Sequence, residues 1–283
     1  MSMPPTKNNV LGKSVIVTGA AAGFGRLIAE KASDMGAKLT CIDINQAVLE
    51  ATVAEINRTG GQAQAVIADV TNLSEMKAAA GRAIEAFGRI DVMVNNAGVM
   101  PLGLYADHEM GAEKWSRCID INIKGVLHGT IAVYDQMMAQ GEGHVINLSS
   151  IYGNFPVFGS AVYGATKTAV NYLSESLRVE TRGKIKVTIV KPTGVPGTEL
   201  SGGVVNPAGA VGIVGQNAAA FLETLDAYRE GQMAPAQLDP ENMDYCVLDP
   251  EHVADQIIYA INQPKGVSIG DITVRASGDH YIL

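Results

Sequence analysis

The sequence Thr18-Gly19-Ala20-Ala21-Ala22-Gly23-Phe24-Gly25 follows a β-branched apolar run at residues 14–18 and opens a segment of helical periodicity at residues 23–35. The first glycine permits a sharp turn, the second lets the main chain approach a pyrophosphate, and the third lets helix and strand pack closely. The helix N-terminus adds free N–H groups and the positive end of its dipole. Because strand and helix flank it as required, the loop predicts a dinucleotide site formed by Gly19, Gly23, Phe24 and Gly25.

Beyond this loop, short apolar runs alternate with amphipathic segments along most of the chain. Strands are predicted at residues 14–18, 38–42, 64–68, 91–94, 144–148, 186–190 and 271–275. Helices are predicted at residues 23–35, 48–58, 72–87 (capped by Asn72 or Ser74), 112–140, 161–182 and 250–262. Continuous apolar strands separated by helices favour parallel pairing with both faces of the sheet covered. The pattern predicts a doubly wound α/β domain, a Rossmann fold with a parallel sheet of about seven strands.

A polar N-terminal stretch and one long interruption stand outside this alternation. Residues 1–10 contain two prolines and no apolar core, so we expect a flexible arm before a single domain at residues 11–283. Residues 194–249 are rich in Gly, Ala, Val and Pro, with a candidate helix at 218–230. A loop of that length within a compact domain usually has a function. We interpret this segment as a helical lid over the substrate. Alternatively, it serves only in packing or in contacts within an oligomer.

The composition excludes several classes of protein. Lys and Arg number 21 against 29 Asp and Glu, which gives a net charge of −8, and 47% of the 283 residues are hydrophobic. A disordered chain would be less apolar, and an acidic surface disfavours nucleic acid. The sequence contains no apolar stretch long enough to span a membrane and no signal peptide, so we expect a cytoplasmic protein. The three cysteines, at positions 41, 118 and 246, show no spacing typical of disulfides or metal sites.

Two acidic residues follow predicted strands. Asp43 comes 18 positions after Gly25, which is close to the separation of about 20 typical of an acid that binds the adenosine ribose hydroxyls. A carboxylate there repels a 2′-phosphate, so NAD is predicted as the cofactor and NADP is disfavoured. Asp69 closes the third strand. We expect Asp69 to contact the adenine, with Val70 beside it at the cofactor, or else to cap the turn before Thr71.

Further polar residues lie at strand ends, where ligands bind in open α/β sheets. Tyr163 and Lys167 are four positions apart in a predicted helix, which places both on one face. Ser149 and Ser150 end the fifth strand, and Asn122 lies in the preceding long helix. The topology therefore brings these side chains to one edge of the sheet.

Together, the loop at 18–25, the Asn95-Asn96-Ala97-Gly98 motif, Ser150 and the Tyr163-xxx-Lys167 pair resemble the short-chain dehydrogenase/reductase family. The resemblance covers residues 11–200 and continues in the 250–262 helix and the last strand. It implies that Tyr163 is the acid–base group and that Ser150 polarises the substrate oxygen. Lys167 would lower the pKa of Tyr163 and bind the nicotinamide ribose.

Other features of the family are carried over in the same way. Asn122 would hold a water that links Lys167 to solvent as a proton relay, and Asn96 would contact the cofactor. Ser149 competes with Ser150 for the serine role, and the family spacing selects Ser150. Members commonly assemble through the long helices that carry these residues, which implies a homotetramer or homodimer.

The segment after the sixth strand departs from the family pattern. Where the family has Pro-Gly, a branched apolar residue and then Thr, this chain has Pro192-Thr193-Gly194-Val195-Pro196-Gly197-Thr198. Val195 stays aligned to bind the nicotinamide carboxamide through its main chain. Thr198, which is also expected to contact the cofactor, lies one position later than usual.

The substrate-binding residues are expected after the fourth and fifth strands and in the 194–249 segment. No lysine or arginine in these segments is an obvious partner for a carboxylate or phosphate, so an apolar or aromatic secondary alcohol or ketone is predicted. An epimerase or dehydratase that uses bound NAD transiently, or a non-enzymatic dinucleotide-binding protein, are the alternatives. The candidate wall residues are Met100, Leu102, Leu104, Tyr152, Asn154, Phe155, Pro156, Val157, Leu200, Val204, Val205, Val211, Ile213, Val214 and Phe221.

Overall fold

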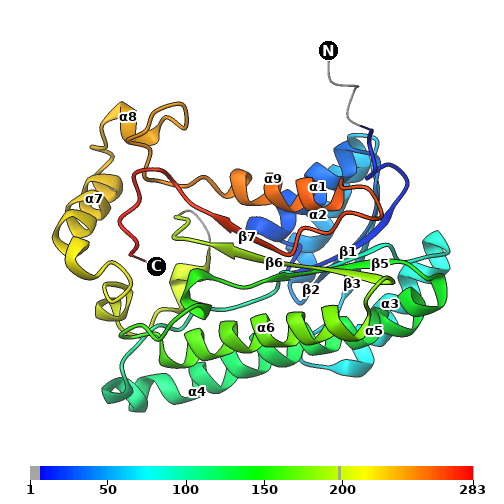
Figure 1. Cartoon of the computed structure of the whole chain (residues 1–283), viewed down its shortest axis with the longest axis horizontal. Coiled ribbons are helices and arrows are strands. Elements are labelled where there is room, and N and C mark those ends of the chain that lie inside the picture. The colour runs from blue at the N-terminus through cyan, green and yellow to red at the C-terminus, as the bar shows by residue number, and fades with distance from the viewer. Residues whose placement is uncertain (1–6, 197–198, 283) are drawn as a thin grey trace.

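The computed structural model describes residues 7–196 and 199–282, in which strands and helices alternate (Figure 1). The strands are β1 (Ser14–Thr18), β2 (Lys38–Asp43), β3 (Gln62–Ile67), β4 (Val92–Asn95), β5 (Gly143–Leu148), β6 (Ile185–Pro192) and β7 (Asp271–Val274). The helices are α1 (Gly23–Asp34), α2 (Gln46–Arg58), α3 (Leu73–Phe87), α4 (His108–Ile119), α5 (Gly125–Gln140), α6 (Ala161–Glu180), α7 (Ala218–Glu230), α8 (Pro235–Leu238) and α9 (Pro250–Ile261). Every strand predicted from the sequence is present, and so is every predicted helix except the one at 112–140, with ends shifted by a few residues.

The seven strands form one parallel sheet in the order β3-β2-β1-β4-β5-β6-β7. The chain adds strands in one direction from β1 to β3 and then in the other from β4 to β7. Ligands of open α/β sheets bind where this order reverses, outside the carboxyl ends of β1 and β4. The predicted doubly wound Rossmann architecture is confirmed.

Two layers of helices cover the sheet. On one face lie α1, α2 and α9, where Ile28 and Ile257 are fully buried in a core cluster (Figure 1). On the other lie α3, α5 and α6, where Met76 and Met137 are buried in a second cluster. Central strands are therefore shielded on both faces, and all five residues of β1 are buried. This double shielding explains the continuous apolar runs of the sequence.

The helix predicted at 112–140 begins earlier and is divided. It starts at His108, and a π-helical turn at Asp120–Lys124 separates α4 from α5. A π turn accommodates one extra residue and changes which side chains face inward. Here Asn122 lies inside this turn with an exposed fraction of 1%. The altered turn therefore buries a predicted site residue.

Of the flexible arm predicted at residues 1–10, the structure describes residues 7–10. The main-chain N–H of Asn9 donates to Asn262 Oδ1 at 2.7 Å, and its side-chain amide donates to the Asn262 carbonyl oxygen at 2.7 Å. Val10 is fully buried in the core cluster. Residues 9 and 10 are therefore attached to the domain, unlike the flexible arm predicted there.

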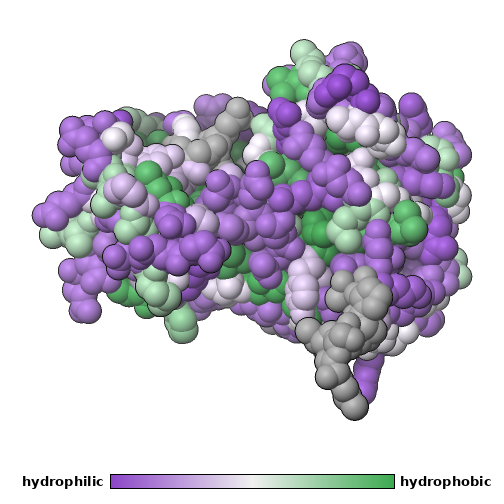
Figure 2. All heavy atoms as spheres, turned by 90° about the horizontal axis from the view of Figure 1, so that it is seen from above, coloured by the Kyte–Doolittle hydropathy of each residue, from purple (hydrophilic) through white to green (hydrophobic). Residues whose placement is uncertain are grey.

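The interruption at 194–249 contains α7 and α8, which lie at one end of the molecule beside residues 275–282, here named the C-terminal tail (Figure 1). The helix predicted at 218–230 is α7. The face drawn in Figure 2 carries small hydrophobic patches among hydrophilic side chains. Within the described ranges, no helix is long and apolar enough to cross a membrane.

Candidate active site

The glycine loop turns where its sequence predicts. Gly19 and Gly23 have φ angles of 65° and 52°, a left-handed conformation in which glycine is the least strained residue. A Cβ atom on Gly25 would lie 2.0 Å from the carbonyl oxygen of Gly19, so a larger residue does not fit. Helix α1 follows Ala22, and no side chain of the described residues caps its first N–H groups, which can therefore bind phosphate oxygens. Phe24 packs against the core below the loop.

The end of β4 holds this loop in place. The side-chain amide of Asn96 donates to the carbonyl oxygens of Thr18 and Gly19 at 2.9 and 3.3 Å. The Thr18 hydroxyl accepts the main-chain N–H groups of Asn96 and Ala97 at 3.0 and 3.1 Å. Asn96 therefore positions the glycine loop, while its contact with a cofactor stays a prediction.

Asp43 ends β2 beside the glycine loop. Its Oδ2 accepts the N–H of Ala21 at 3.1 Å, and its Oδ1 accepts the N–H of Asn45 at 2.9 Å. The side chain is half-buried. These bonds fix the carboxylate at the loop and leave each oxygen a further lone pair for a hydroxyl donor.

Asp69 and Val70 lie just beyond the end of β3. Asp69 is exposed, and its Oδ1 accepts the N–H of Thr71 at 2.8 Å. This bond caps the turn before Thr71, as in the second of the two roles considered for Asp69. Val70 is buried, and its carbonyl oxygen lies 2.9 Å from Nδ1 of His128. A Cβ atom on Gly125 would lie 2.9 Å from the Val70 side chain, so α5 packs tightly on this residue. The adenine contact of Asp69 and the cofactor contact of Val70 stay predictions.

Tyr163, Lys167 and Ser150 come together at the carboxyl end of β5. Their exposed fractions are 4, 5 and 7%. Lys167 Nζ lies 5.7 Å from the centre of the Tyr163 ring and donates to the Leu148 carbonyl oxygen at 2.8 Å. The Ser149 hydroxyl instead donates to the Lys167 carbonyl oxygen at 3.2 Å. The Ser149 hydroxyl is therefore engaged by α6, and the assignment of the serine role to Ser150 stays a prediction.

Burial perturbs both titratable groups of this site. It raises the pKa of the Tyr163 phenol above its usual value, and a hydrogen bond with Ser150 opposes the rise. Burial lowers the pKa of the Lys167 ammonium to about 8. A phenol and a cation that titrates near neutral pH thus share one buried site, a combination suited to acid–base chemistry.

Asn122 connects the π-helical turn to the segment after β4. Its Oδ1 accepts the N–H of Val99 at 2.9 Å, and its Nδ2 donates to the Val99 carbonyl oxygen at 3.0 Å. The same Nδ2 donates to Thr166 Oγ1 at 3.1 Å, next to Lys167 in α6. A Cβ atom on Gly98 would lie 3.2 Å from Asn122 Oδ1 and 3.7 Å from Lys167 Nζ. Asn122 therefore lies close to Lys167, and Thr166, which the sequence analysis missed, anchors it.

Two described residues of the segment after β6, Thr193 and Val195, are candidate residues of the site. The N–H of Thr193 donates to the Val274 carbonyl oxygen at 3.2 Å, which extends the pairing of β6 with β7. The Thr193 hydroxyl is buried and has no hydrogen-bond partner in the described part of the chain. Val195 packs against the core on the α1 side. Thr198 lies outside the described residues.

An apolar cluster surrounds Tyr163 and contains most of the predicted wall residues. They are Met100, Leu102, Tyr152, Val157, Val204, Val211, Ile213, Val214 and Phe221. The predicted residues outside this cluster are Leu104, Asn154, Phe155, Pro156, Leu200 and Val205. Tyr281 of the C-terminal tail also belongs to the cluster. Sequence analysis missed Tyr281 because it lies beyond the last strand, where no periodic pattern marks it.

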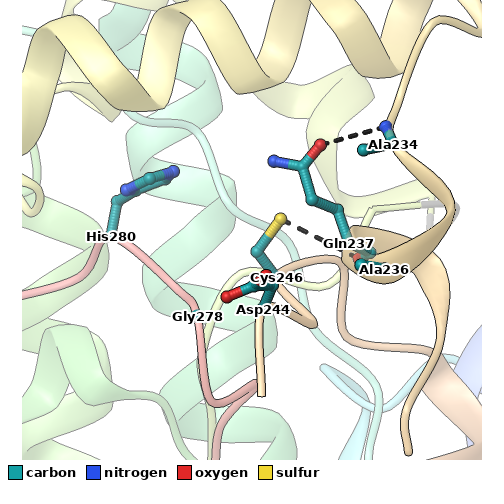
Figure 3. A pocket seen from close by; sticks show the side chains of 7 residues that line it. All are labelled: Ala234, Ala236, Gln237, Asp244, Cys246, Gly278 and His280. Carbon is teal, nitrogen blue, oxygen red and sulfur yellow. Dashed lines mark hydrogen bonds between the residues drawn. The ribbon is translucent and has the colours of Figure 1, made fainter. Parts of the chain in front are cut away.

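A separate cavity of about 430 Å³ lies between the insertion and the C-terminal tail (Figure 3). Its lining residues are Ala234, Ala236, Gln237, Asp244, Cys246, Gly278 and His280. None of the predicted catalytic residues is among them. Burial raises the pKa of the Cys246 thiol, which is therefore a poor nucleophile at neutral pH. The cavity is a gap in the packing of α8 against the tail, apart from the Tyr163 site.

Comparisons with known proteins agree with this geometry. The family described as short chain dehydrogenase matches residues 13–207. An uncharacterized oxidoreductase of Staphylococcus epidermidis is 31% identical over 263 residues, which covers 93% of this chain and 96% of that protein.

Solved structures show the same likeness over nearly the whole chain. A short chain dehydrogenase/reductase of Burkholderia phymatum, in complex with NAD, has a TM-score of 0.73 and 27% identity, covering 94% of this chain and 89% of that one. A metagenomic short-chain oxidoreductase in complex with NADP has a TM-score of 0.71 and 27% identity, covering 94% and 98%. Family, relatives and fold agree, and the chain belongs to the short-chain dehydrogenase/reductase family of oxidoreductases.

Proposed function

We propose that this protein is an NAD(H)-dependent alcohol dehydrogenase or ketone reductase, which transfers a hydride between the nicotinamide and a secondary alcohol or ketone. The observation that carries the proposal is the buried group of Tyr163, Lys167 and Ser150. The apolar cluster around Tyr163 supports a substrate with an apolar or aromatic skeleton.

The residues at the carboxyl edge of the sheet fit a dinucleotide. A Cβ atom on Gly19 or Gly25 would collide with Asn96 or with the loop itself, so glycine is needed for this turn, and no described side chain caps the first N–H groups of α1. Asp43 would bind the adenosine ribose, and the main chain of Val195 the carboxamide. The buried Thr193 hydroxyl would find at the nicotinamide end the partner that it lacks among the described residues. The cofactor supplies the carbon that accepts or gives the hydride.

Tyr163 moves the proton in this proposal. During alcohol oxidation its phenolate oxygen takes the proton of the substrate hydroxyl, and during reduction its phenol returns a proton to the carbonyl oxygen. Because burial raises the pKa of Tyr163, the phenolate needs positive charge nearby, and Lys167 supplies an ammonium group. Ser150 donates a hydrogen bond to the same substrate oxygen as negative charge develops there.

Asn122 would take part in the exit of the proton to solvent. Its side chain is occupied by Val99 and Thr166. The main-chain carbonyl of Asn122, in the widened π-helical turn, is then the group to hold a water that receives a proton from Lys167. The side chain positions this carbonyl by fixing the turn against the segment after β4.

Turnover of secondary alcohols tests the proposed function. We expect NADH to form when the protein is incubated with NAD and a panel of aliphatic, cyclic and aryl-substituted secondary alcohols, and to be consumed with the matching ketones. Absorbance of the reduced nicotinamide measures both directions. Conversion of a substrate without net NADH would indicate an epimerase or dehydratase instead. Bound NAD without conversion of any compound would indicate a dinucleotide-binding protein that is not an enzyme.

The preference for NAD over NADP depends in this proposal on Asp43. For Asp43→Asn we expect kcat/KM with NADP, divided by kcat/KM with NAD, to rise about 10- to 100-fold, because removing a charge near the 2′-phosphate changes binding by about 1–3 kcal/mol. Steady-state kinetics with both cofactors measure this ratio. Glu50→Gln, which removes an exposed carboxylate from α2, is the matched control and should leave the ratio unchanged. An unchanged ratio in Asp43→Asn would contradict the assigned role.

Assembly into a homodimer or homotetramer and a cytoplasmic location complete the proposal. Leu127 and Ile131 on α5, and Tyr172 and Val179 on α6, are exposed apolar side chains on the helices that carry or adjoin the site. Burial of such side chains against a second copy would stabilise an oligomer. The three cysteines are free thiols, which agrees with a reducing compartment.

A further inference from the structure

The C-terminal tail closes one side of the reaction site. Arg275 pairs with Asp279 at 2.6 Å, and the same guanidinium donates to the carbonyl oxygen of Tyr281 at 2.6 Å. The N–H of Ile282 donates to the carbonyl oxygen of Ile213 at 3.1 Å. The tail is thereby folded on itself and joined to the insertion by main-chain bonds.

A second set of contacts fixes the tail against α7. The Asn217 side chain donates to the His280 carbonyl oxygen at 3.0 Å, and Thr224 Oγ1 lies 3.0 Å from Nε2 of His280. The Phe221 ring lies 6.1 Å from the ring of Tyr281, centre to centre. His280 also lines the cavity of Figure 3, across from Gln237 of α8. Tyr281 is therefore held by anchored neighbours on both sides.

The hydroxyl of Tyr281 reaches the segment assigned to the nicotinamide. A Cβ atom on Gly194 would lie 1.5 Å from the Tyr281 hydroxyl oxygen, so this oxygen occupies the space that a side chain at 194 would need. Gly194 directly precedes Val195. Tyr281 also belongs to the apolar cluster that contains Tyr152 and Tyr163. A second phenol thus stands beside the reacting end of the site.

Among the described residues, no hydrogen bond is formed by the hydroxyl of Tyr281 or by that of Tyr152. Over residues 7–196 and 199–282, the hydrogen bonds of Tyr281 involve its N–H and its carbonyl oxygen, and that of Tyr152 involves its N–H. Burial raises the pKa of Tyr281 to about 12, so its hydroxyl stays protonated and can donate. The charged groups of the tail, Arg275 and Asp279, pair with each other. The tail therefore offers the site a neutral donor.

We propose that Tyr281 determines specificity: its hydroxyl, with that of Tyr152, binds a second, uncharged oxygen that the substrate carries near its reacting carbon. The preferred substrates are then diols and hydroxy ketones, whose carbon skeleton contacts the apolar cluster. This inference rests on the proposed function, because it names the substrate class of the same site. A substrate without the second oxygen leaves the two hydroxyls without a partner, which lowers its affinity.

Kinetics on a matched substrate pair test the inference. Cyclohexanol and 1,2-cyclohexanediol differ by one oxygen, and we expect kcat/KM of the wild type to favour the diol by about tenfold or more. Tyr281→Phe keeps the ring that packs on Phe221 and should abolish this preference, mainly by raising KM for the diol. Tyr228→Phe, on α7 in the insertion, is the matched control and should retain it. Equal preference in wild type and Tyr281→Phe would overturn the inference.

A binding measurement separates this inference from the proposed function. In a Tyr163→Phe background, quenching of NADH fluorescence should show tighter binding of 2-hydroxycyclohexanone than of cyclohexanone. Adding Tyr281→Phe should remove that difference. If binding discriminates but the wild type oxidises no alcohol, the proposed function fails and the role of Tyr281 stands. If the wild type is active and the two ketones bind with equal affinity, the inference on Tyr281 is overturned. It is also overturned if the protein neither oxidises an alcohol nor binds either ketone.

Discussion

Replacing Tyr163 with phenylalanine should reduce kcat for alcohol oxidation by about 10³-fold or more, since it removes the group that we propose takes the proton. The ring packs at 5.6 Å from that of Tyr152 and is retained in the variant, so the fold should persist. Tyr163 lies in α6 and not at the glycine loop. The dissociation constant of NADH should therefore stay near that of the wild type. Steady-state turnover and NADH fluorescence measure the two quantities.

The matched control for Tyr163→Phe is a tyrosine far from the site. Tyr259→Phe removes a phenol hydroxyl from α9, where the side chain is 53% exposed, and should change neither quantity. The wild-type rate of oxidation should rise with pH, because the raised pKa of Tyr163 keeps the phenol protonated at low pH and oxidation needs the phenolate. If Tyr163→Phe retained substantial turnover, another residue would be the base.

The glycine loop and the sheet were predictable because each depends on local sequence. Gly19, Gly23 and Gly25 meet requirements of turn geometry and close packing that residue type alone reveals. Parallel strand pairing follows from helices between short apolar runs. The Tyr163–Lys167 pair was equally visible, since four positions in a helix place two side chains on one face.

Other features depend on contacts between distant parts of the chain or on one extra residue. The π-helical turn at Asp120–Lys124 adds a residue without interrupting the helix, so helical periodicity does not signal it. Tyr281 follows no repeating pattern, and its place beside Gly194 depends on the anchoring of the tail by Asn217 and Thr224. Such positions follow from tertiary packing and become visible only in the structure.

Burial of the Lys167 side chain should lower the stability of the fold, a cost that follows from the catalytic role proposed for Lys167. Burial lowers the pKa of its ammonium from an ordinary value of 10.5 to about 8. Below pH 8 both the folded and the unfolded chain bind the proton, so the fold bears the full cost of a buried charge, about 3 kcal/mol. As pH rises from 8 to 10.5 the folded state releases its proton first, and the free energy of unfolding should increase.

Lys167→Met tests this trade-off. Turnover should fall by about 10²-fold or more, because the phenolate of Tyr163 loses the adjacent ammonium. The cofactor-free variant should nevertheless be as stable as the wild type or up to about 2 kcal/mol more stable at pH 7, since losing the buried charge outweighs the lost hydrogen bond to the Leu148 carbonyl. Urea unfolding from pH 7 to 10 measures both stabilities.

The difference between the two pH profiles identifies the cause. The free energy of unfolding of the wild type should increase relative to that of Lys167→Met as pH rises from 8 to 10.5, because only the wild type releases a buried proton in that range. Lys265→Met, at a side chain that is 81% exposed, should instead follow the wild-type profile. A marked destabilisation of Lys167→Met at pH 7 would show that the Leu148 hydrogen bond dominates and that the buried charge is well compensated. The predicted outcome would show that Lys167 lowers the stability of the fold and would support its role in proton transfer as the reason for its presence.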